Sequence, residues 1–258
     1  MMKLIDTHTH LFAKEFDNDI NDVIENAINM GVEKMLLPNI DSTTTESMIN
    51  LCQKFPINCY PMIGLHPCSV QRDNVEKEIE QIQDELKRNK FVAIGEIGID
   101  LYWDKTTLDV QKEAFETQIK IAKDNNLPIV IHTRNSFNEA YEIVQKLNDK
   151  NLSGVFHCFS GTLDDAKKIL DLENFYLGIG GVVTFKNGGI DKIINQISLE
   201  HLILETDSPY LTPVPNRGKR NESKYILDIA KKLSEIYDMS INDIAKKTTY
   251  NANKLFKL

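Results

Sequence analysis

The stretch KLIDTHTH (residues 3–10) joins a short apolar run to two histidines that stand two residues apart, His8 and His10. Further runs rich in Ile, Val, Leu or Phe follow along the chain. Apolar runs without strict alternation are typical of strands that are buried on both faces of a parallel sheet. Together the runs lie at residues 3–10, 32–39, 59–67, 91–100, 127–133, 154–161, 175–181 and 201–209. The sequence therefore predicts eight buried strands.

Amphipathic segments lie between these runs. In DNDINDVIENAINMG (17–31) apolar residues recur at helical spacing, and Gly31 is a stop signal. Residues 106–126, 223–237 and 240–256 show the same helical pattern. Strands that alternate with helices predict an α/β fold, and the eight runs favour a (β/α)8 TIM-type barrel over a doubly wound open sheet. We expect one domain over residues 1–258.

Composition narrows the class of protein. The chain has 258 residues, 41% of them hydrophobic, and a net charge of −8, which argues against a surface coated with cations for nucleic acid but leaves room for a local phosphate site. Its four cysteines form no CxxC pair and are expected to be reduced. Because no apolar run reaches a signal core or a membrane span, we expect a cytoplasmic protein that does not bind membranes.

Residues that can bind metal gather where the predicted strands end. Five of the six histidines lie there, namely His8, His10, His66, His132 and His157. Glu96 lies in the fourth run, and Glu205 and Asp207 lie at the end of the eighth, whereas His201 begins a strand and is expected to be structural. Active sites of such barrels lie at the carboxyl ends of the strands. Imidazoles and carboxylates brought together there are the ligands of zinc, manganese or similar ions.

The spacing of these residues sharpens the prediction. Residues two apart on a strand point to the same side, so His8 and His10 could bind one ion. Glu96 is flanked by Gly95 and Gly98, and glycines in a strand often mark the close approach of another group. A buried Glu without a partner is costly, and a nearby cation removes that cost. If Glu96 is central among the strands, it could bridge two ions. His66 could instead orient a ligand or the substrate.

Seven motifs, taken in order, resemble a known family. They are DTHTH (6–10), GLHP (64–67), GEIGID (95–100), IHTR (131–134), FHCFSG (156–161), LETDSPYLTP (204–213) and NRGKRNE (216–222). Together they resemble the TatD-family metal-dependent hydrolases, often called TatD deoxyribonucleases, which belong to the amidohydrolase superfamily. The resemblance runs from residue 4 to the C-terminus.

The resemblance implies two divalent ions, Mg, Mn or Zn, in a barrel. It assigns His8, His10 and Asp207 to the first ion, and His132 and His157 to the second. Glu96 takes the bridging position, and Asp207 and Glu96 are the implied catalytic residues. The chain departs from the family pattern at Arg134-Asn135, Tyr102-Trp103-Asp104 and Asn221-Glu222-Ser223.

Two ions a few ångströms apart activate a water and clamp the oxygens of a displacement at phosphorus. Phosphate recognition needs cations, and aromatic rings can stack on bases. The predicted substrate contacts are His66, Arg134, Lys186, Arg217, Tyr102 and Trp103.

Three functions compete at this stage. The resemblance implies a deoxyribonuclease that removes nucleotides in the 3′-to-5′ direction, with single-stranded DNA or 3′ ends as substrate. The alternative is a metal-dependent ester or amide hydrolase such as a D-aminoacyl-tRNA deacylase. The third is a metal-stabilised scaffold, which an intact two-ion ligand set disfavours. No obligate protein partner is expected.

Overall fold

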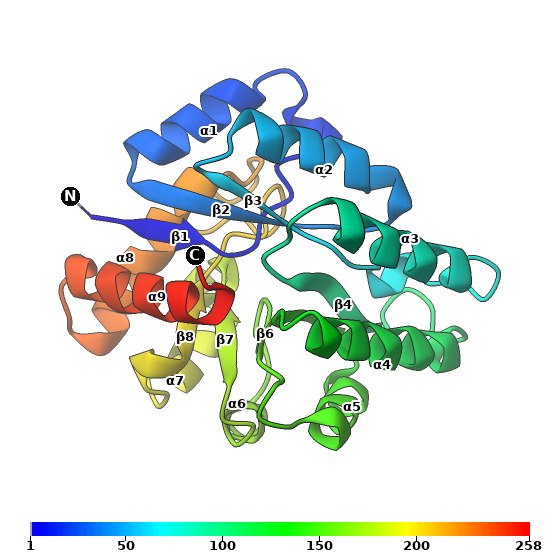
Figure 1. Ribbon diagram of the computed structural model, residues 1–258. Helices are drawn as coiled ribbons and strands as arrows, with labels where there is room; N and C mark the ends of the chain where they lie inside the picture. The colour runs from blue at the N-terminus through cyan, green and yellow to red at the C-terminus, as the bar shows by residue number, and fades with distance from the viewer. Residues whose placement is uncertain (1) are drawn as a thin grey trace.

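The chain folds into a parallel β-barrel surrounded by helices, as the computed structural model shows (Figure 1). The structure describes residues 2–258, so the first residue of the predicted domain lies outside the described residues. The strands are β1 (Leu4–Asp6), β2 (Val32–Pro38), β3 (Cys59–Met62), β4 (Ile94–Asp100), β5 (Ile129–Arg134), β6 (Gly154–Phe156), β7 (Phe175–Ile179) and β8 (Leu202–Leu204). Seven of them fall within the predicted apolar runs, and β5 extends one residue beyond its run, to Arg134.

The strands pair in chain order and in parallel. One sheet has the order β1-β2-β3 and the other β4-β5-β6-β7-β8. Parallel bridges between Ile63 and Ile94, and between Thr9 and Ser208, join the two sheets at both edges. The amide of Thr7 also donates to the carbonyl of Leu204 at 3.0 Å. The ring of strands is thereby closed, which confirms the predicted barrel and excludes the doubly wound sheet, whose strand order would reverse.

Helices follow the strands around the outside of the barrel. They are α1 (Ile20–Asn29), α2 (Ser42–Lys54), α3 (Val75–Arg88), α4 (Leu108–Asp124), α5 (Phe137–Leu147), α6 (Leu163–Leu170), α7 (Ile190–Ile194), α8 (Ile226–Tyr237) and α9 (Ile241–Phe256). The segments predicted at 17–31, 106–126, 223–237 and 240–256 correspond to α1, α4, α8 and α9. Helix α1 ends before Gly31, as the sequence predicted.

The apolar interior of the barrel forms a layer below the site. Each strand or its immediate start contributes one buried residue, namely Ile5, Leu36, Met62, Ala93, Val130, Val155, Tyr176 and Ile203. Ala252, Leu255 and Phe256 of α9 pack against this layer, and α9 lies beside β1 (Figure 1). The interior is therefore filled with side chains at one end and free to hold polar groups at the other.

The pleat of the strands places the polar layer directly above. Val130, Val155 and Ile203 belong to the apolar layer, and two positions later come His132, His157 and Glu205. Because side chains two apart point to the same side of a strand, these polar groups enter the barrel interior near its carboxyl end.

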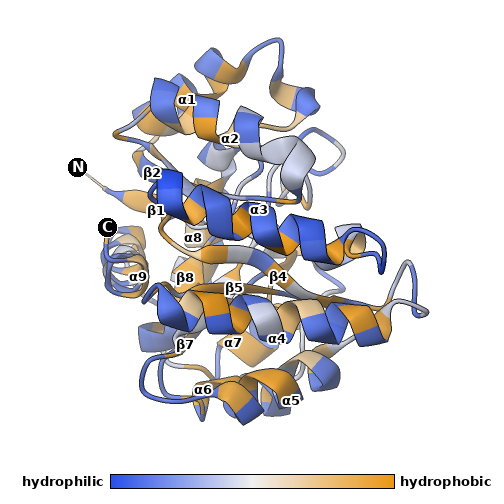
Figure 2. Ribbon diagram, turned by 45° about the vertical axis from the view of Figure 1, so that its right-hand side comes forward, coloured by the Kyte–Doolittle hydropathy of each residue, from blue (hydrophilic) through white to orange (hydrophobic). Residues whose placement is uncertain are grey.

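The outer face of the molecule is polar. The helices carry hydrophilic residues along their exposed sides, while β4 and β5 are largely hydrophobic where α3 and α4 flank them (Figure 2). Within residues 2–258, no helix combines the length and apolar character that crossing a bilayer requires.

Candidate metal centre

A cavity of about 780 Å³ opens at the carboxyl ends of the strands. Side chains from six of the eight strand ends line it, including five of the predicted ligands and His66. These lining residues are His10, His66, Glu96, His132, His157 and Asp207. His8, the sixth predicted ligand, is fully buried beneath them and contacts Glu96. The structure thus brings all the predicted metal ligands to one place.

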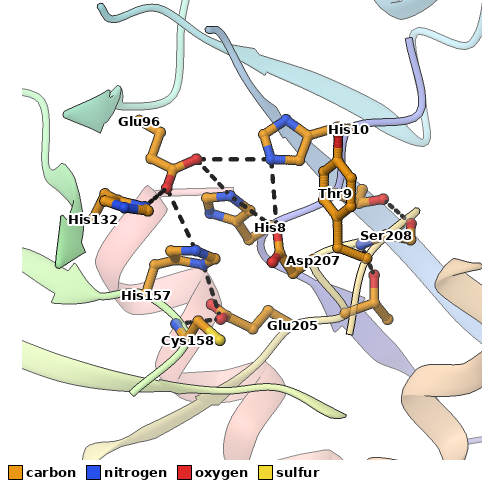
Figure 3. Close-up of polar contacts among 12 residues, drawn as sticks. His8, Thr9, His10, Glu96, His132, His157, Cys158, Glu205, Asp207 and Ser208 are labelled. Atoms are coloured by element: carbon orange, nitrogen blue, oxygen red, sulfur yellow. Dashed lines mark hydrogen bonds and ion pairs between the residues drawn. The ribbon is translucent and has the colours of Figure 1, made fainter. Parts of the chain in front are cut away.

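The carboxylate of Glu96 lies at the middle of the cluster (Figure 3). Its Oε2 atom lies 3.1 Å from His8 Nε2 and 3.7 Å from His10 Nε2. Its Oε1 atom lies 2.6 Å from His132 Nδ1 and 3.5 Å from His157 Nε2. The two oxygens therefore face two different groups of imidazoles.

The first group contains His8, His10 and Asp207. Asp207 Oδ1 lies 3.5 Å from His10 Nε2 and 3.8 Å from His8 Nε2. The backbone joins these residues as well, since the Asp207 amide donates to the His8 carbonyl at 2.9 Å. The predicted pair of histidines two apart therefore shares one side, although both lie beyond the last residue of β1.

The second group is larger than the sequence predicted. His66 Nε2 lies 3.5 Å from Glu96 Oε1 and 3.3 Å from His132 Nδ1, so His66 is as close to the carboxylate as His157 is. His157 lies between the two groups, because its ring also stacks on that of His8 with the centroids 3.6 Å apart. We call His8, His10 and Asp207 the first cluster, and His66, His132 and His157 the second cluster.

Two further acids support the second cluster. Asp100 Oδ2 lies 2.9 Å from His132 Nε2, and Glu205 Oε1 lies 3.0 Å from His157 Nδ1. Gly178 leaves room for Glu205, since a side chain at that position would overlap the carboxylate. The sequence analysis placed Glu205 among the strand-end residues that can bind metal but assigned it to neither ion, and it did not select Asp100. The fourth apolar run ends in Asp100, so the strand-end argument that selected the histidines could have found it.

Irregular backbone turns the central residues inward. Between Ile94 and Ile97, three steps along β4 match only two steps along β5, which inserts an extra residue next to Glu96. At Gly98 (φ +143°) a side chain would meet the backbone oxygen of His132, which confirms the predicted close approach. Asp207 adopts a left-handed backbone (φ +57°), a conformation that is uncommon in residues other than glycine but that aspartate tolerates better than most.

The acids at the centre are ionised in this environment. Burial opposes ionisation of Glu96, but the charges of His66, His157 and His8 outweigh burial and hold its pKa well below the usual value. The pKa of Asp207 is also lowered, because a hydrogen bond to His10 and nearby imidazole charge outweigh the effect of burial. Ionised carboxylates are the form that binds cations.

The supporting acids shift the pKa of their partners. Burial would lower the pKa of His157, but Glu205 and Glu96 raise it to about 10. The pKa of His132 is raised as well, since its hydrogen bonds to Asp100 and Glu96 outweigh burial. Asp100 itself has a pKa lowered to about 2, because its hydrogen bond to His132 and its bond from the Tyr102 amide outweigh burial.

The donor set fits divalent metal ions. One possible ligand atom from each member of the triplets His8–His10–Asp207, His66–Glu96–His132 and His8–Glu96–His157 lies within 4.8 Å of the other two. That spacing suits donors about 2.0–2.2 Å from a shared ion. A cation would also offset the negative charge of the buried carboxylates of Glu96 and Asp207, whose pKa values are both lowered.

The predicted substrate contacts divide into two sets. Trp103 and Arg134 line the cavity, and Tyr102 lies against Arg134. Lys186 and Arg217 are exposed and are not among the residues that line the cavity. Arg217 stacks on Phe185 and donates to the Thr212 carbonyl at 3.2 Å.

Tyr210, which the sequence interpretation did not select, also lines the cavity. Its ring centroid lies 6.2 Å from that of His10, and half of the side chain is exposed. Nothing in the sequence pattern marked Tyr210, because it follows Asp207 in a loop and not at the end of a strand.

Known proteins resemble this chain over nearly its whole length. Residues 5–257 match the family described as TatD related DNase. The chain is 39% identical to the uncharacterized metal-dependent hydrolase YabD of Bacillus subtilis (strain 168), over 99% of each sequence. It is 30% identical to the uncharacterized metal-dependent hydrolase YcfH of Escherichia coli (strain K12), over 100% of this chain and 97% of YcfH.

A solved structure has the same fold over nearly the whole chain. The crystal structure of YjjV, a TatD homologue from Escherichia coli K12, superposes with a TM-score of 0.91 at 27% sequence identity. The match covers 99% of this chain and 98% of YjjV. Sequence and structure therefore agree over nearly the whole length.

Proposed function

Because this chain belongs to the TatD-related DNase family of metal-dependent hydrolases, we propose that it hydrolyses phosphodiester bonds of DNA from the 3′ end of a single strand. The observation that carries the proposal is the division of the Glu96 carboxylate between the two clusters. Oε2 faces His8 and Oε1 faces His132, so one side chain can serve two ions at once.

Each cluster would hold one ion. His8, His10 and Asp207 would bind the first ion, and His132 and His157 the second, with Glu96 shared. His66 is close enough to join the second cluster or to contact the substrate. When bound, such a pair of divalent ions supplies Lewis acidity and an activated water for attack at phosphorus. Ligands rich in imidazole nitrogen favour zinc, whereas magnesium and manganese suit the carboxylate oxygens that the site also offers.

The side chains of the protein have three tasks. Glu96 contacts both clusters, through Oε2 at His8 and Oε1 at His132, and so fixes their positions relative to each other. Asp207, ionised and at the edge of the cavity, can accept the proton of the attacking water at a carboxylate oxygen. As metal ligands the imidazoles would be neutral, so two divalent cations would outweigh the charges of Glu96 and Asp207 and attract an anionic phosphodiester despite the net charge of −8.

Purified protein tests the proposal directly. It is incubated with magnesium, manganese or zinc and with single-stranded DNA that carries a label at its 5′ end. We expect products that shorten one nucleotide at a time, and no shortening by the Glu96→Gln variant. The label at the 5′ end makes stepwise loss from the 3′ end visible.

A D-aminoacyl-tRNA is offered in a parallel reaction. Deacylation without shortening of DNA would replace the proposal by the esterase alternative. Neither activity with any of the three metals would leave only a metal-stabilised scaffold.

A further inference from the structure

An arginine stacked on two aromatic side chains forms one wall of the cavity. Arg134 Cζ lies 3.7 Å from the centre of the Tyr102 ring and 5.5 Å from the centre of the Trp103 ring. The two rings meet edge to face, with centroids 4.9 Å apart and planes at 89°. We call Tyr102, Trp103 and Arg134 the stacked wall.

The stacked wall is tied to the second cluster. Asp100, which contacts His132, accepts the amide of Tyr102 at 2.8 Å and that of Trp103 at 3.4 Å. The amide of Leu101 also donates to the carbonyl of Arg134 at 2.9 Å. The same carboxylate thus orients a metal ligand and holds the loop that carries the aromatic residues.

The polar and aromatic surfaces of the wall are free. Tyr102 is 52% exposed and Trp103 72% exposed, so at least one ring face is open to a ligand. Among residues 2–258, no carboxylate pairs with Arg134, whereas Arg220 in the loop after β8 pairs with Asp19 at 2.6 Å. An unpaired guanidinium held by stacking is ready to bind an anion.

We propose that the stacked wall is a nucleotide subsite, in which a base of the substrate stacks on Trp103 and a neighbouring phosphate binds Arg134. The inference rests on the proposed function and adds to it the residues that bind one base and one phosphate of the substrate. A base that stacks on Trp103 cannot remain stacked in a duplex, so the subsite selects unpaired nucleotides and requires an intact base at one position.

Kinetics of the metal-loaded enzyme on single-stranded DNA test the base contact. Trp103→Leu should raise KM about 5- to 150-fold, the range measured for loss of one base–aromatic stack, with kcat changed less than twofold. Trp103→Phe keeps a ring and should stay near the wild type. Tyr250→Ala is the matched control, because Tyr250 is 60% exposed beneath Lys247 in α9 and does not line the cavity.

Substrates with one abasic residue locate the contact. Moving that residue along the strand should raise the KM of the wild type at one position and leave Trp103→Leu unchanged at that position. Arg134→Gln should lower the slope of log affinity against log salt by about 0.7, the loss of one phosphate contact on a single strand.

Fluorescence provides a readout that does not depend on turnover. Trp103 is the one tryptophan of the chain, so its emission reports on the wall alone. An oligonucleotide with phosphorothioate linkages at its 3′ end should quench the emission of the metal-loaded protein, and an abasic oligonucleotide of equal length should not.

The outcomes separate the two proposals. If no metal supports cleavage of DNA but the intact oligonucleotide alone quenches Trp103, the proposed function fails and the subsite stands. If DNA is shortened but Trp103→Leu matches the wild type and abasic substrates behave as intact ones, the subsite is wrong.

Discussion

The two clusters that share Glu96 are held in place by different means. The first cluster comes from two adjacent segments after β1 and β8, whose backbones are hydrogen-bonded to each other; the His10 amide donates to the Ser208 carbonyl at 2.8 Å. The second cluster comes from the separate strand ends of β3, β5 and β6. Two of its imidazoles have a carboxylate behind them, Asp100 at His132 and Glu205 at His157, whereas His66 Nδ1 accepts the amide of Cys68.

The ring nitrogens show part of this difference. In the first cluster the Nδ1 atoms of His8 and His10 have no hydrogen-bond partner among the described residues, and His157 Nδ1 of the second cluster also forms no hydrogen bond, although Glu205 Oε1 lies 3.0 Å away. In the second cluster His132 contacts acids through both ring nitrogens. A carboxylate behind an imidazole fixes its tautomer and raises its basicity. We therefore expect the metal affinity of the second cluster to depend on the acids that contact its imidazoles. The metal affinity of the first cluster should depend on the backbone hydrogen bonds that hold its residues.

The largest effect is expected from Glu96→Gln, which removes the charge that both clusters share. We expect kcat/KM to fall roughly 10⁴-fold or more, since several kcal/mol of transition-state stabilisation depends on the metal site. Metal content after dialysis should fall at both clusters together. Retention of the wild-type metal content would show that the clusters bind independently of Glu96.

A smaller effect is expected from Asp207→Asn, which acts on the first cluster alone. We expect kcat to fall about 10³-fold, because the variant loses a ligand and a proton acceptor together. Calorimetric titration with metal should still show binding at the second cluster. An equal loss of metal affinity at both clusters would contradict the view that Asp207 acts on the first cluster alone.

Asp100→Asn tests the support of the second cluster. Loss of an acid behind a ligand is expected to weaken metal affinity there about 10- to 100-fold, with the first cluster unchanged. Glu205→Gln, behind His157, is the matched variant and should act in the same direction. The result that would count against this interpretation is unchanged affinity in both variants.

The smallest effect is expected at the outer support of the first cluster. Arg220 donates to Asp19 at 2.8 and 2.6 Å and so fastens the loop after β8 to the start of α1. Arg220→Ala should lower the free energy of unfolding by about 0.2–1 kcal/mol, the range for partly exposed ion pairs, with little change in kcat. Urea unfolding curves of the wild type and the variant measure this difference in the free energy of unfolding.

The same pair predicts a pH dependence with a definite sign. The hydrogen bond from Arg220 lowers the pKa of Asp19 in the folded protein. The stabilisation is therefore present above the ordinary carboxyl pKa of about 3.9 and is lost as the pH falls through the lowered value. The difference between the wild type and Arg220→Ala should be full at neutral pH and vanish in acid.

Much of the site was readable from the chain. The strand ends at His8, His132 and His157 could be found because buried runs stop at regular intervals and the next polar residue must lie at the rim. The same argument applied to Asp100 would have extended the site. The loop cations were harder to interpret: Lys186 and Arg217 lie away from the cavity lining, and Arg220 is paired with Asp19.

The spacing of apolar residues along the sequence was enough to predict an eight-stranded barrel with metal-binding side chains at one rim. This is because the repeat of a strand or a helix can be recognised within a few neighbouring residues. Which atoms meet depended on the folded molecule. The extra residue in β4 turns Glu96 inward, and the left-handed backbone of Asp207 aims it at His8 and His10. The distances between these side chains depend on the register of strands that are far apart in the sequence. A bulge that shifts this register by one residue leaves no periodic signal in the sequence.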